Sequence, residues 1–173
     1  EQNPYFGVST FEKFKSENLD ESAKDEFFQT GESHIQRVWQ EIEENFCKDF
    51  NPQRAMDFGC GVGRLVIPLA KRCKEVVGID ISEKMLDESK KNSLQNGLEN
   101  VEFYLSDENL SKVSGKFDLI HSFIVFQHIN PEIGEKVFKR MLELLADDGI
   151  GALQFTFKHP ADKSEVFRFK LYR

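Results

Sequence analysis

Three glycines in a short loop are the residues whose type and spacing best suit ligand binding. Gly59, Gly61 and Gly63 follow the apolar segment 54–58 and come directly before an apolar stretch that begins near Arg64. A glycine loop between a strand and a helix lets the backbone approach a ligand closely, because no Cβ atom blocks the way. The loop favours a nucleoside cofactor. The alternative is a tight turn that merely happens to be rich in glycine.

The spacing of these glycines separates two classes of cofactor. A dinucleotide-binding loop follows the pattern GxGxxG. Here the third glycine comes one residue early, and Arg64 stands where that pattern has glycine. Asp57 precedes the loop, where a carboxylate can hold an ammonium group or orient the loop but would repel a pyrophosphate. The loop therefore disfavours a dinucleotide.

Two further carboxylates stand where later strands are predicted to end. Asp80 follows the glycine loop at a distance where a carboxylate can accept hydrogen bonds from both ribose hydroxyls. Its alternative is a surface acid at a strand end. Asp107, next to the backbone of Glu108, is a candidate for reading the amino edge of adenine. Its alternative is an aspartate that only caps a turn.

His128 is the best candidate for a general base, since it follows the predicted strand 117–125. Its alternative is a histidine at the start of a helix that hydrogen-bonds the backbone. His34, His121 and His159 lie within an apolar strand or outside these motifs and are predicted to be structural. No metal site is predicted, because no group of His, Cys, Asp and Glu has ligand spacing. A nucleophile elbow is also absent.

Alternating strands and helices are predicted to position these residues. Apolar strands are expected at 54–58, 75–80, 101–105, 117–125 and 150–157, with helices starting near Arg64, after Ser82 and at Pro131. This alternation predicts an α/β fold with a doubly wound, mostly parallel sheet that is covered on both faces. Ligands bind such sheets at the carboxyl ends of the strands, where the strand order reverses. The glycine loop and the acidic residues all fall at that edge.

The segment before this core has a different pattern. Residues 1–50 are predicted to form an N-terminal helical cap or lid, with short helical pieces over 5–30 and an amphipathic helix over 33–46. Residues 51–157 are expected to form the cofactor-binding core.

Composition narrows the classes of partner. A net charge of −7 and a pI near 5.2 disfavour nucleic acid and an anionic membrane surface, so the expected partner is a small-molecule substrate. Cys47, Cys60 and Cys73 form no CxxC pair, which favours a reducing, cytoplasmic location. No apolar run is long enough to span a membrane, and no signal peptide is apparent. The oligomeric state is not indicated.

Four motifs together resemble a known family. Asp57-Phe-Gly-Cys-Gly-Val-Gly63, Gly78-Ile-Asp-Ile-Ser82, Ser106-Asp107 and Phe117-Asp-Leu-Ile120 are similar, in order and spacing, to the motifs of class I S-adenosylmethionine-dependent methyltransferases. The resemblance covers residues 53–157 and implies a Rossmann-like methyltransferase fold. The segment 123–129 resembles the small-molecule, type 11/12-like branch of that family.

The resemblance also implies roles for individual residues. S-adenosylmethionine would be the cofactor and S-adenosylhomocysteine the product. The implied contacts are Asp57, Gly59 and Gly61 with the methionine part, Asp80 with the ribose, Ile81 and Met85 with the adenine face, Asp107 with the adenine amino group, and Phe123 near the sulfonium. Cys60 and Glu108, which neighbour these residues, are also expected to contact the cofactor. His128 would be the base where one is needed.

The leading hypothesis is transfer of a methyl group to oxygen, nitrogen or carbon of a small molecule. One alternative is a cofactor-binding module without catalysis. The other, a nicotinamide-dependent oxidoreductase, conflicts with Arg64 and Asp57.

The two ends of the chain carry separate expectations. Tyr5 and Phe6 are expected to close over the cofactor as a lid, as in related enzymes. Residues 158–173 form a C-terminal extension that is too short for the family's usual last helix and two closing strands. The closing strands are therefore expected to be missing.

Overall fold

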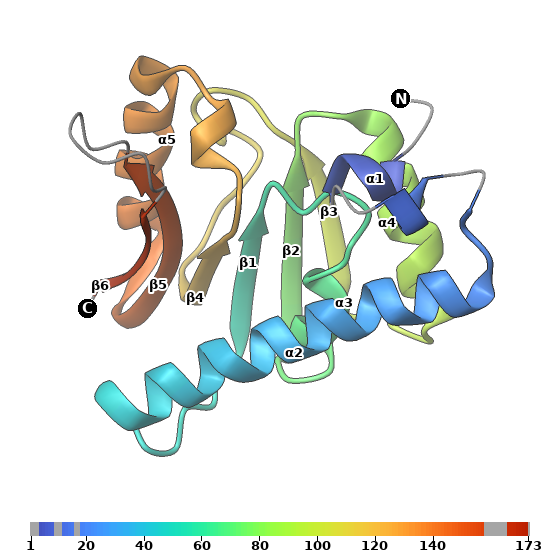
Figure 1. Cartoon of the computed structure of the whole chain (residues 1–173). Coiled ribbons are helices and arrows are strands. Elements are labelled where there is room, and N and C mark those ends of the chain that lie inside the picture. Colours follow the sequence, from blue (N-terminus) through green and yellow to red (C-terminus); the bar gives the residue numbers. More distant parts are fainter. Residues whose placement is uncertain (1–3, 9–11, 16–17, 158–165, 173) are drawn as a thin grey trace.

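A six-stranded sheet forms the central layer of the protein in the computed structural model, which describes residues 4–8, 12–15, 18–157 and 166–172 (Figure 1). Its strands are β1 (Arg54–Phe58), β2 (Glu75–Asp80), β3 (Val101–Leu105), β4 (Phe117–Ser122), β5 (Leu145–Phe157) and β6 (Val166–Tyr172). Their order is β3-β2-β1-β4-β5-β6, with β6 antiparallel and the other pairs parallel. The predicted doubly wound, mostly parallel sheet is confirmed, and its order reverses between β1 and β4.

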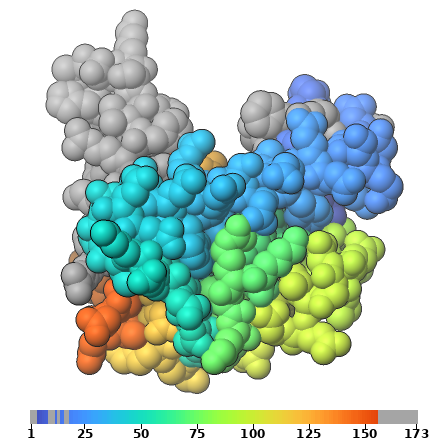
Figure 2. Space-filling model, turned by 90° about the horizontal axis from the view of Figure 1, so that it is seen from below, coloured from blue at the N-terminus to red at the C-terminus, as the bar shows by residue number. Residues whose placement is uncertain are grey.

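Helices cover both faces of this sheet. One face carries α2 (Glu21–Asn45), α3 (Val66–Ala70) and α4 (Glu83–Gln95), and the other carries α5 (Pro131–Leu144). Because side chains alternate along a strand, Ala55 packs with the α2 face and Met56 with the α5 face. Seen from below, α2 lies across the green segments that follow β1 (Figure 2). Shorter helical pieces are α1 (Pro4–Val8), η1 (Glu12–Phe14) and η2 (Phe126–His128).

The helix predicted over 33–46 begins twelve residues earlier, at Glu21. Asp20 caps it, since its carboxylate accepts a hydrogen bond from the Ala23 N–H at 2.8 Å. Its buried stripe extends upstream through Phe27 and Gly31. A Cβ atom on Gly31 would lie 2.1 Å from the Arg64 carbonyl oxygen, so this glycine allows α2 to approach the segment after β1. Gly31 therefore belongs to the packed face although it carries no apolar side chain.

Two element boundaries follow from local backbone geometry. β4 ends at Ser122, three residues before the predicted end, because Ile124 turns the chain with φ of 61°. The helix expected from Arg64 is a short one, Val66–Ala70, that follows a turn. By contrast, α4 and α5 begin where they were predicted, after Ser82 and at Pro131, and each has a side-chain cap. Ser82 accepts from the Met85 N–H at 3.4 Å, and Asn130 from the Glu132 N–H at 2.9 Å.

The expectation that the closing strands are missing is wrong for one strand. Val166–Tyr172 forms β6 and pairs antiparallel with β5, from Gly151↔Tyr172 to Phe157↔Val166. The sequence carries a signal for it, since Phe167, Phe169 and Leu171 alternate with charged residues at period two. Pairing with β5 covers what would otherwise be the sheet edge.

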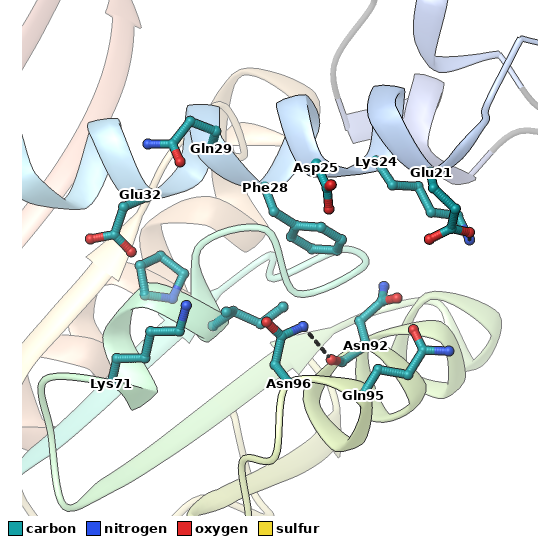
Figure 3. Close-up of a pocket in the computed structure, with 12 residues that line it drawn as sticks. Glu21, Lys24, Asp25, Phe28, Gln29, Glu32, Lys71, Asn92, Gln95 and Asn96 are labelled. Atoms are coloured by element: carbon teal, nitrogen blue, oxygen red, sulfur yellow. Dashed lines mark hydrogen bonds and ion pairs between the residues drawn. The ribbon is translucent and has the colours of Figure 1, made fainter.

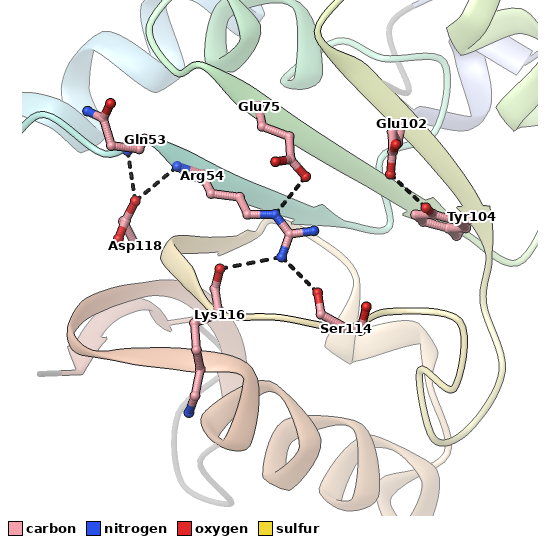
Figure 4. Close-up of polar contacts among 8 residues, drawn as sticks. All are labelled: Gln53, Arg54, Glu75, Glu102, Tyr104, Ser114, Lys116 and Asp118. Atoms are coloured by element: carbon pink, nitrogen blue, oxygen red, sulfur yellow. Dashed lines mark hydrogen bonds and ion pairs between the residues drawn. The ribbon is translucent and has the colours of Figure 1, made fainter.

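Polar contacts hold the amino ends of the strands together, opposite the glycine loop (Figure 4). Arg54 Nε donates to Glu75 Oε1 at 2.6 Å, and Arg54 Nη1 donates to the Ser114 carbonyl at 2.7 Å. The Asp118 carboxylate accepts from the backbone N–H groups of Gln53 and Arg54 at 2.8 and 2.9 Å. These contacts fix β1 between β2 and β4. Among the described residues, no helix is long and apolar enough to cross a membrane.

Candidate active site

The glycine loop lies at the carboxyl end of β1 and is packed from both sides. Gly59 and Gly61 have φ of 76° and 55°, a region that side chains rarely adopt. A Cβ atom on Gly59 would lie 2.2 Å from Val125 Cγ2, and one on Gly61 would lie 2.6 Å from Val8 Cγ2. The loop therefore requires glycine for its backbone and for the close approach of both α1 and the segment after β4.

Asp80 ties this loop to β2. Its carboxylate accepts from the Gly61 N–H at 2.8 Å and from the Ser82 N–H at 2.9 Å. A carboxylate offers about four acceptor positions, so it can hold the loop and also accept from a pair of hydroxyl groups. The neighbouring Ile81 has 84% of its surface exposed, which is unusual for a large apolar side chain at a strand end. Such an exposed face suits a planar ring.

Asp57 is buried at the end of β1 and bonded to a histidine. Its Oδ1 lies 2.8 Å from His121 Nδ1, and the two residues are partners in the β1–β4 register. His121 Nε2 in turn lies 3.1 Å from His34 Nε2 on α2. The second oxygen of Asp57, Oδ2, is buried and accepts no hydrogen bond from any residue that the structure describes. A buried carboxylate oxygen in this state is a costly arrangement without a further donor.

Arg64 and Phe123 complete the surroundings of this chain of polar groups. The Arg64 side chain is buried, which lowers its pKa, while the charge of Asp57 opposes that shift. Arg64 Nη1 donates to Thr30 Oγ1 at 3.3 Å, and the guanidinium lies 5.8 Å from the Phe123 ring centre. The rings of Phe123 and His34 have centres 4.1 Å apart. Phe123, expected near the reacting centre, thus lies beside the Asp57 network.

Asp107 lies at the other end of this edge, and its carboxylate stabilises the turn that follows β3. Its carboxylate accepts from the N–H groups of Asn109 and Ser111 at 2.9 and 3.0 Å, and also from the Ser111 hydroxyl. These bonds lower the pKa of Asp107, with the Ser111 hydroxyl as the largest cause. Glu108 is exposed and lies 3.3 Å from Lys136 Nζ. Turn capping, the alternative named for Asp107, therefore describes its contacts in this structure.

Two other expected contact residues have buried side chains. Cys60 is buried beneath the loop near Asp57 and Asp80, and burial raises the pKa of its thiol well above the usual value. Met85 packs in a cluster with Tyr5, Phe27 and other apolar residues. Their side chains offer little surface to a ligand, so a contact from Cys60 would come from its backbone.

His128 is exposed on η2, with its Nε2 3.1 Å from Nε2 of the Gln127 side-chain amide. Its backbone N–H donates to the Val125 carbonyl at 2.9 Å. The loop before η2 is strained at Ile124, since a β-branched residue rarely adopts positive φ. The buried Gln154 holds this conformation, because its side-chain oxygen accepts from the Ile124 N–H at 2.9 Å.

A separate groove lies away from the glycine loop and Asp107 (Figure 3). Its volume is about 460 Å³, and α2, α3 and α4 line it with Glu21, Lys24, Asp25, Phe28, Gln29, Glu32, Ile67, Pro68, Lys71, Asn92, Gln95 and Asn96. Carboxylates and lysines are mixed on its walls, so it shows no preference for one sign of charge. Within the part of the chain that the structure describes, no group of three His, Cys, Asp or Glu residues could hold a metal ion.

Sequence reasoning missed the interactions of His34, His121 and Gln154. Counting back from the predicted ends of two strands would have paired His121 with Asp57, since both belong to neighbouring parallel strands. No sequence signal links His34 to that pair, because the contact depends on how α2 crosses the sheet. Gln154 was hidden within an apolar strand in the same way.

Comparison with known proteins places this geometry in context. The chain is 40% identical over 73 residues to the 23S rRNA (uracil(1939)-C(5))-methyltransferase RlmD of Alkalilimnicola ehrlichii, covering 39% of this chain and 16% of that protein. It is 25% identical to PKMT2 from Rickettsia typhi, solved with AdoHcy, with a TM-score of 0.55, covering 60% of this chain and 21% of the other. A S-adenosylmethionine-dependent methyltransferase from Clostridium acetobutylicum shares the fold, with a TM-score of 0.64 at 15% identity over 96% of this chain and 78% of that one.

The expectation that nucleic acid is not a partner is wrong in the light of these relatives, which include proteins named as RNA methyltransferases. The expectation rested on a net charge of −7 over 173 residues. Net charge describes these residues alone and says nothing about a basic surface supplied by another domain or subunit. An acidic domain can therefore still act on RNA.

The family comparison covers the core of the sheet. Residues 55–149 match the family described as methyltransferase domain, Methyltransf_25. The match runs from β1 to the beginning of β5 and includes the glycine loop, Asp80 and Asp107. The chain belongs to this family of methyltransferase domains.

Proposed function

We propose that this chain binds S-adenosylmethionine along the carboxyl ends of β1, β2 and β3 and transfers its methyl group to an acceptor at the end of β4. The observation that carries the proposal is the buried Asp57 Oδ2, which accepts no hydrogen bond from the described residues. An ammonium group is a donor that would satisfy this carboxylate. The methionine part of the cofactor carries an ammonium group, so the residues present fit it.

The rest of the cofactor fits the same edge in the direction of β3. Asp80 would accept from the ribose hydroxyls while it holds the glycine loop. The exposed Ile81 would cover one face of the adenine. The turn that Asp107 stabilises would bound the amino edge of the base, with the backbone of Glu108 within that turn. These roles extend the proposal from the methionine part to the whole nucleoside.

The reacting end would lie by Phe123 and the strained loop that leads to η2. The cofactor supplies an electrophilic methyl group, and the protein's task is to hold the acceptor nucleophile in line with it. Phe123 and Val125 form an apolar wall there, and Gln154 fixes the loop that carries them. His128 on η2 would take the proton of an acceptor whose nucleophile is poorly acidic.

The N-terminal segment would act as a cover over the methionine part. Tyr5 is buried, and its hydroxyl oxygen lies 3.0 Å from each of two acceptors on α4, Glu88 Oε1 and Asn92 Oδ1, which share its one hydrogen. Val8, at the other end of α1, packs over Gly61. These contacts support the lid expected from Tyr5 and Phe6. The division into a cap over 1–50, a core over 51–157 and an extension over 158–173 is part of the same proposal.

The proposal also concerns the class of methyl acceptor, and two observations favour different classes. The net charge of −7 supports a small neutral or cationic acceptor. The names of curated relatives support RNA, but the matched segment spans 16% of the length of RlmD from Alkalilimnicola ehrlichii. The free thiols of Cys60 and Cys73, both buried, support a reducing cytoplasmic location.

A methyl-transfer assay tests the proposal. Purified protein is incubated with methyl-labelled S-adenosylmethionine and either unmodified 23S rRNA or a panel of small amines, phenols and carbon acids. We expect label in one acceptor class, and loss of that transfer in Asp80→Ala. Binding of the cofactor without transfer to either class would contradict the enzymatic proposal and favour a binding module without catalysis.

A further inference from the structure

A continuous chain of side chains connects α2 to the glycine loop through the centre of the protein. Asp57 on β1 bonds His121 on β4 at 2.8 Å, and His121 bonds His34 on α2 at 3.1 Å. Asp57 and His121 have 2% and 1% of their surfaces exposed. Three elements far apart in the sequence therefore meet through three polar side chains in an otherwise apolar layer.

The pattern of donors and acceptors limits where the hydrogens can lie. The Asp57 carboxylate accepts, so His121 Nδ1 carries a hydrogen. The contact between His121 Nε2 and His34 Nε2 requires one hydrogen between two nitrogens. In the arrangement in which His121 carries its one hydrogen on Nδ1, His34 Nε2 donates and His121 Nε2 accepts. His34 thereby fixes the tautomer of His121 that donates to Asp57.

The charged groups around His34 favour this neutral arrangement. Burial is the largest cause that lowers the pKa of His34, to about 3, and His121, Arg64 and Arg37 lower it further. His34 is therefore neutral at physiological pH and available as a hydrogen-bond donor. Arg64, buried close to Asp57, compensates the charge of the carboxylate.

We propose that His34 and His121 are positioning residues that fix the Asp57 carboxylate, with Oδ1 bonded and Oδ2 left to accept from the ammonium group of the cofactor. This inference rests on the proposed function. It makes α2 a part of the methionine subsite, although no α2 residue need touch the cofactor. The contact also couples the N-terminal segment to the end of β1.

Two ligands separate this role from a general effect on folding. S-adenosylhomocysteine carries the amino acid part, whereas 5′-methylthioadenosine has the same nucleoside without it. Only the first can bond Asp57 through an ammonium group. If His34 is a positioning residue, its substitution should lower the affinity for S-adenosylhomocysteine alone. If its role is merely structural, the affinities for both ligands should fall by similar factors.

The experiment measures both affinities by calorimetry for the wild type, His34→Phe and His34→Gln. We expect His34→Phe to bind S-adenosylhomocysteine about tenfold more weakly, with a change below about twofold for 5′-methylthioadenosine. His34→Gln should restore most of the affinity, because its side-chain N–H can donate to His121. Gln36→Phe, at an exposed position on α2, is the matched control and should bind both ligands normally.

A second comparison keeps the proposal testable if His34→Phe does not fold. In an Asp57→Asn background, exchange of His34 for Ala should have no further effect on S-adenosylhomocysteine, because the group it positions has lost its charge. Equal losses for both ligands, or additive effects of the two substitutions, would overturn the inference. A wild type that binds neither ligand would instead contradict the proposed function.

Discussion

Two carboxylates at the same edge of the sheet are held in different ways. Asp57, at the end of β1, is 2% exposed and bonds to a buried histidine from another strand. Asp107, after β3, is exposed and accepts hydrogen bonds from Asn109 and Ser111 in the turn that follows it. The first depends on the packing of α2, β1 and β4, while the second depends on two residues of its own turn.

This difference indicates which part of the edge determines cofactor binding. A buried charge that loses its partner is costly, whereas an exposed charge is readily solvated. Changes near the glycine loop should therefore affect ligand binding and stability strongly, and changes near Asp107 should affect them weakly.

Gly59→Ala should have the largest effect. Gly59 has φ of 76°, and an added Cβ atom would lie 2.2 Å from Val125 Cγ2. Backbone strain together with overpacking should lower the affinity for S-adenosylhomocysteine about a hundredfold. Gly97→Ala is the matched control, since Gly97 has φ of 68° but open space around it. Equal affinity losses in the two variants would show that the approach of Val125 is unimportant.

Asp80→Asn should lower the affinity for S-adenosylhomocysteine about tenfold or more, because charge-assisted bonds to the loop and the ribose are lost. Asp107→Asn should lower the same affinity about threefold at most, because water can solvate the exposed turn at Asp107. Titration calorimetry on both variants measures the ratio. A greater loss of affinity in Asp107→Asn than in Asp80→Asn would contradict the claim that residues near the glycine loop determine cofactor binding more than residues near Asp107.

His34→Gln should alter the dependence of stability on pH. His34 has a pKa of about 3 in the folded protein and an ordinary value of 6.5, so the unfolded chain binds more protons between these values. The contribution is fully present above pH 6.5 and is lost as the pH falls towards 3. The wild type should therefore lose unfolding free energy more steeply than the variant below pH 6.5, by at most about 1.4 kcal/mol per pH unit. Urea unfolding at several pH values measures both slopes, and parallel slopes would argue against a neutral, partly buried His34.

Glu108→Gln should have the smallest effect. Its carboxylate forms an exposed ion pair with Lys136 at 3.3 Å, and such pairs contribute little. We expect an unchanged melting temperature and an affinity for S-adenosylhomocysteine within about twofold of the wild type. A larger loss of affinity would mean that the side chain of Glu108, rather than its backbone, contacts the ligand.

The sequence predicts the parts of this edge that depend on local pattern. The glycine loop, Ser82 as a helix cap and the positions of Asp57, Asp80 and Asp107 at strand ends all follow from spacing and turn chemistry. The fold class follows from the alternation of apolar strands with helices. Such features are readable because each is encoded within a few residues.

What the sequence did not predict depends on contacts between distant segments. The bond from His34 to His121 requires α2 to cross the sheet at one height, which Gly31 allows by its approach to Arg64. β6 has a period-two pattern, but the resemblance to the family implied that the residues after β5 are too few for the closing strands. The exclusion of nucleic acid rested on charge alone. Each of these features depends on a partner elsewhere in the chain or outside it.

Titration of the wild-type protein with S-adenosylhomocysteine, and separately with NADH, tests the central claim most directly. Binding of a nucleoside amino acid at the glycine loop predicts micromolar affinity for S-adenosylhomocysteine, none for NADH, and a marked loss of affinity in Asp57→Asn. Saturable binding of NADH without binding of S-adenosylhomocysteine would contradict the account, and so would full affinity in Asp57→Asn.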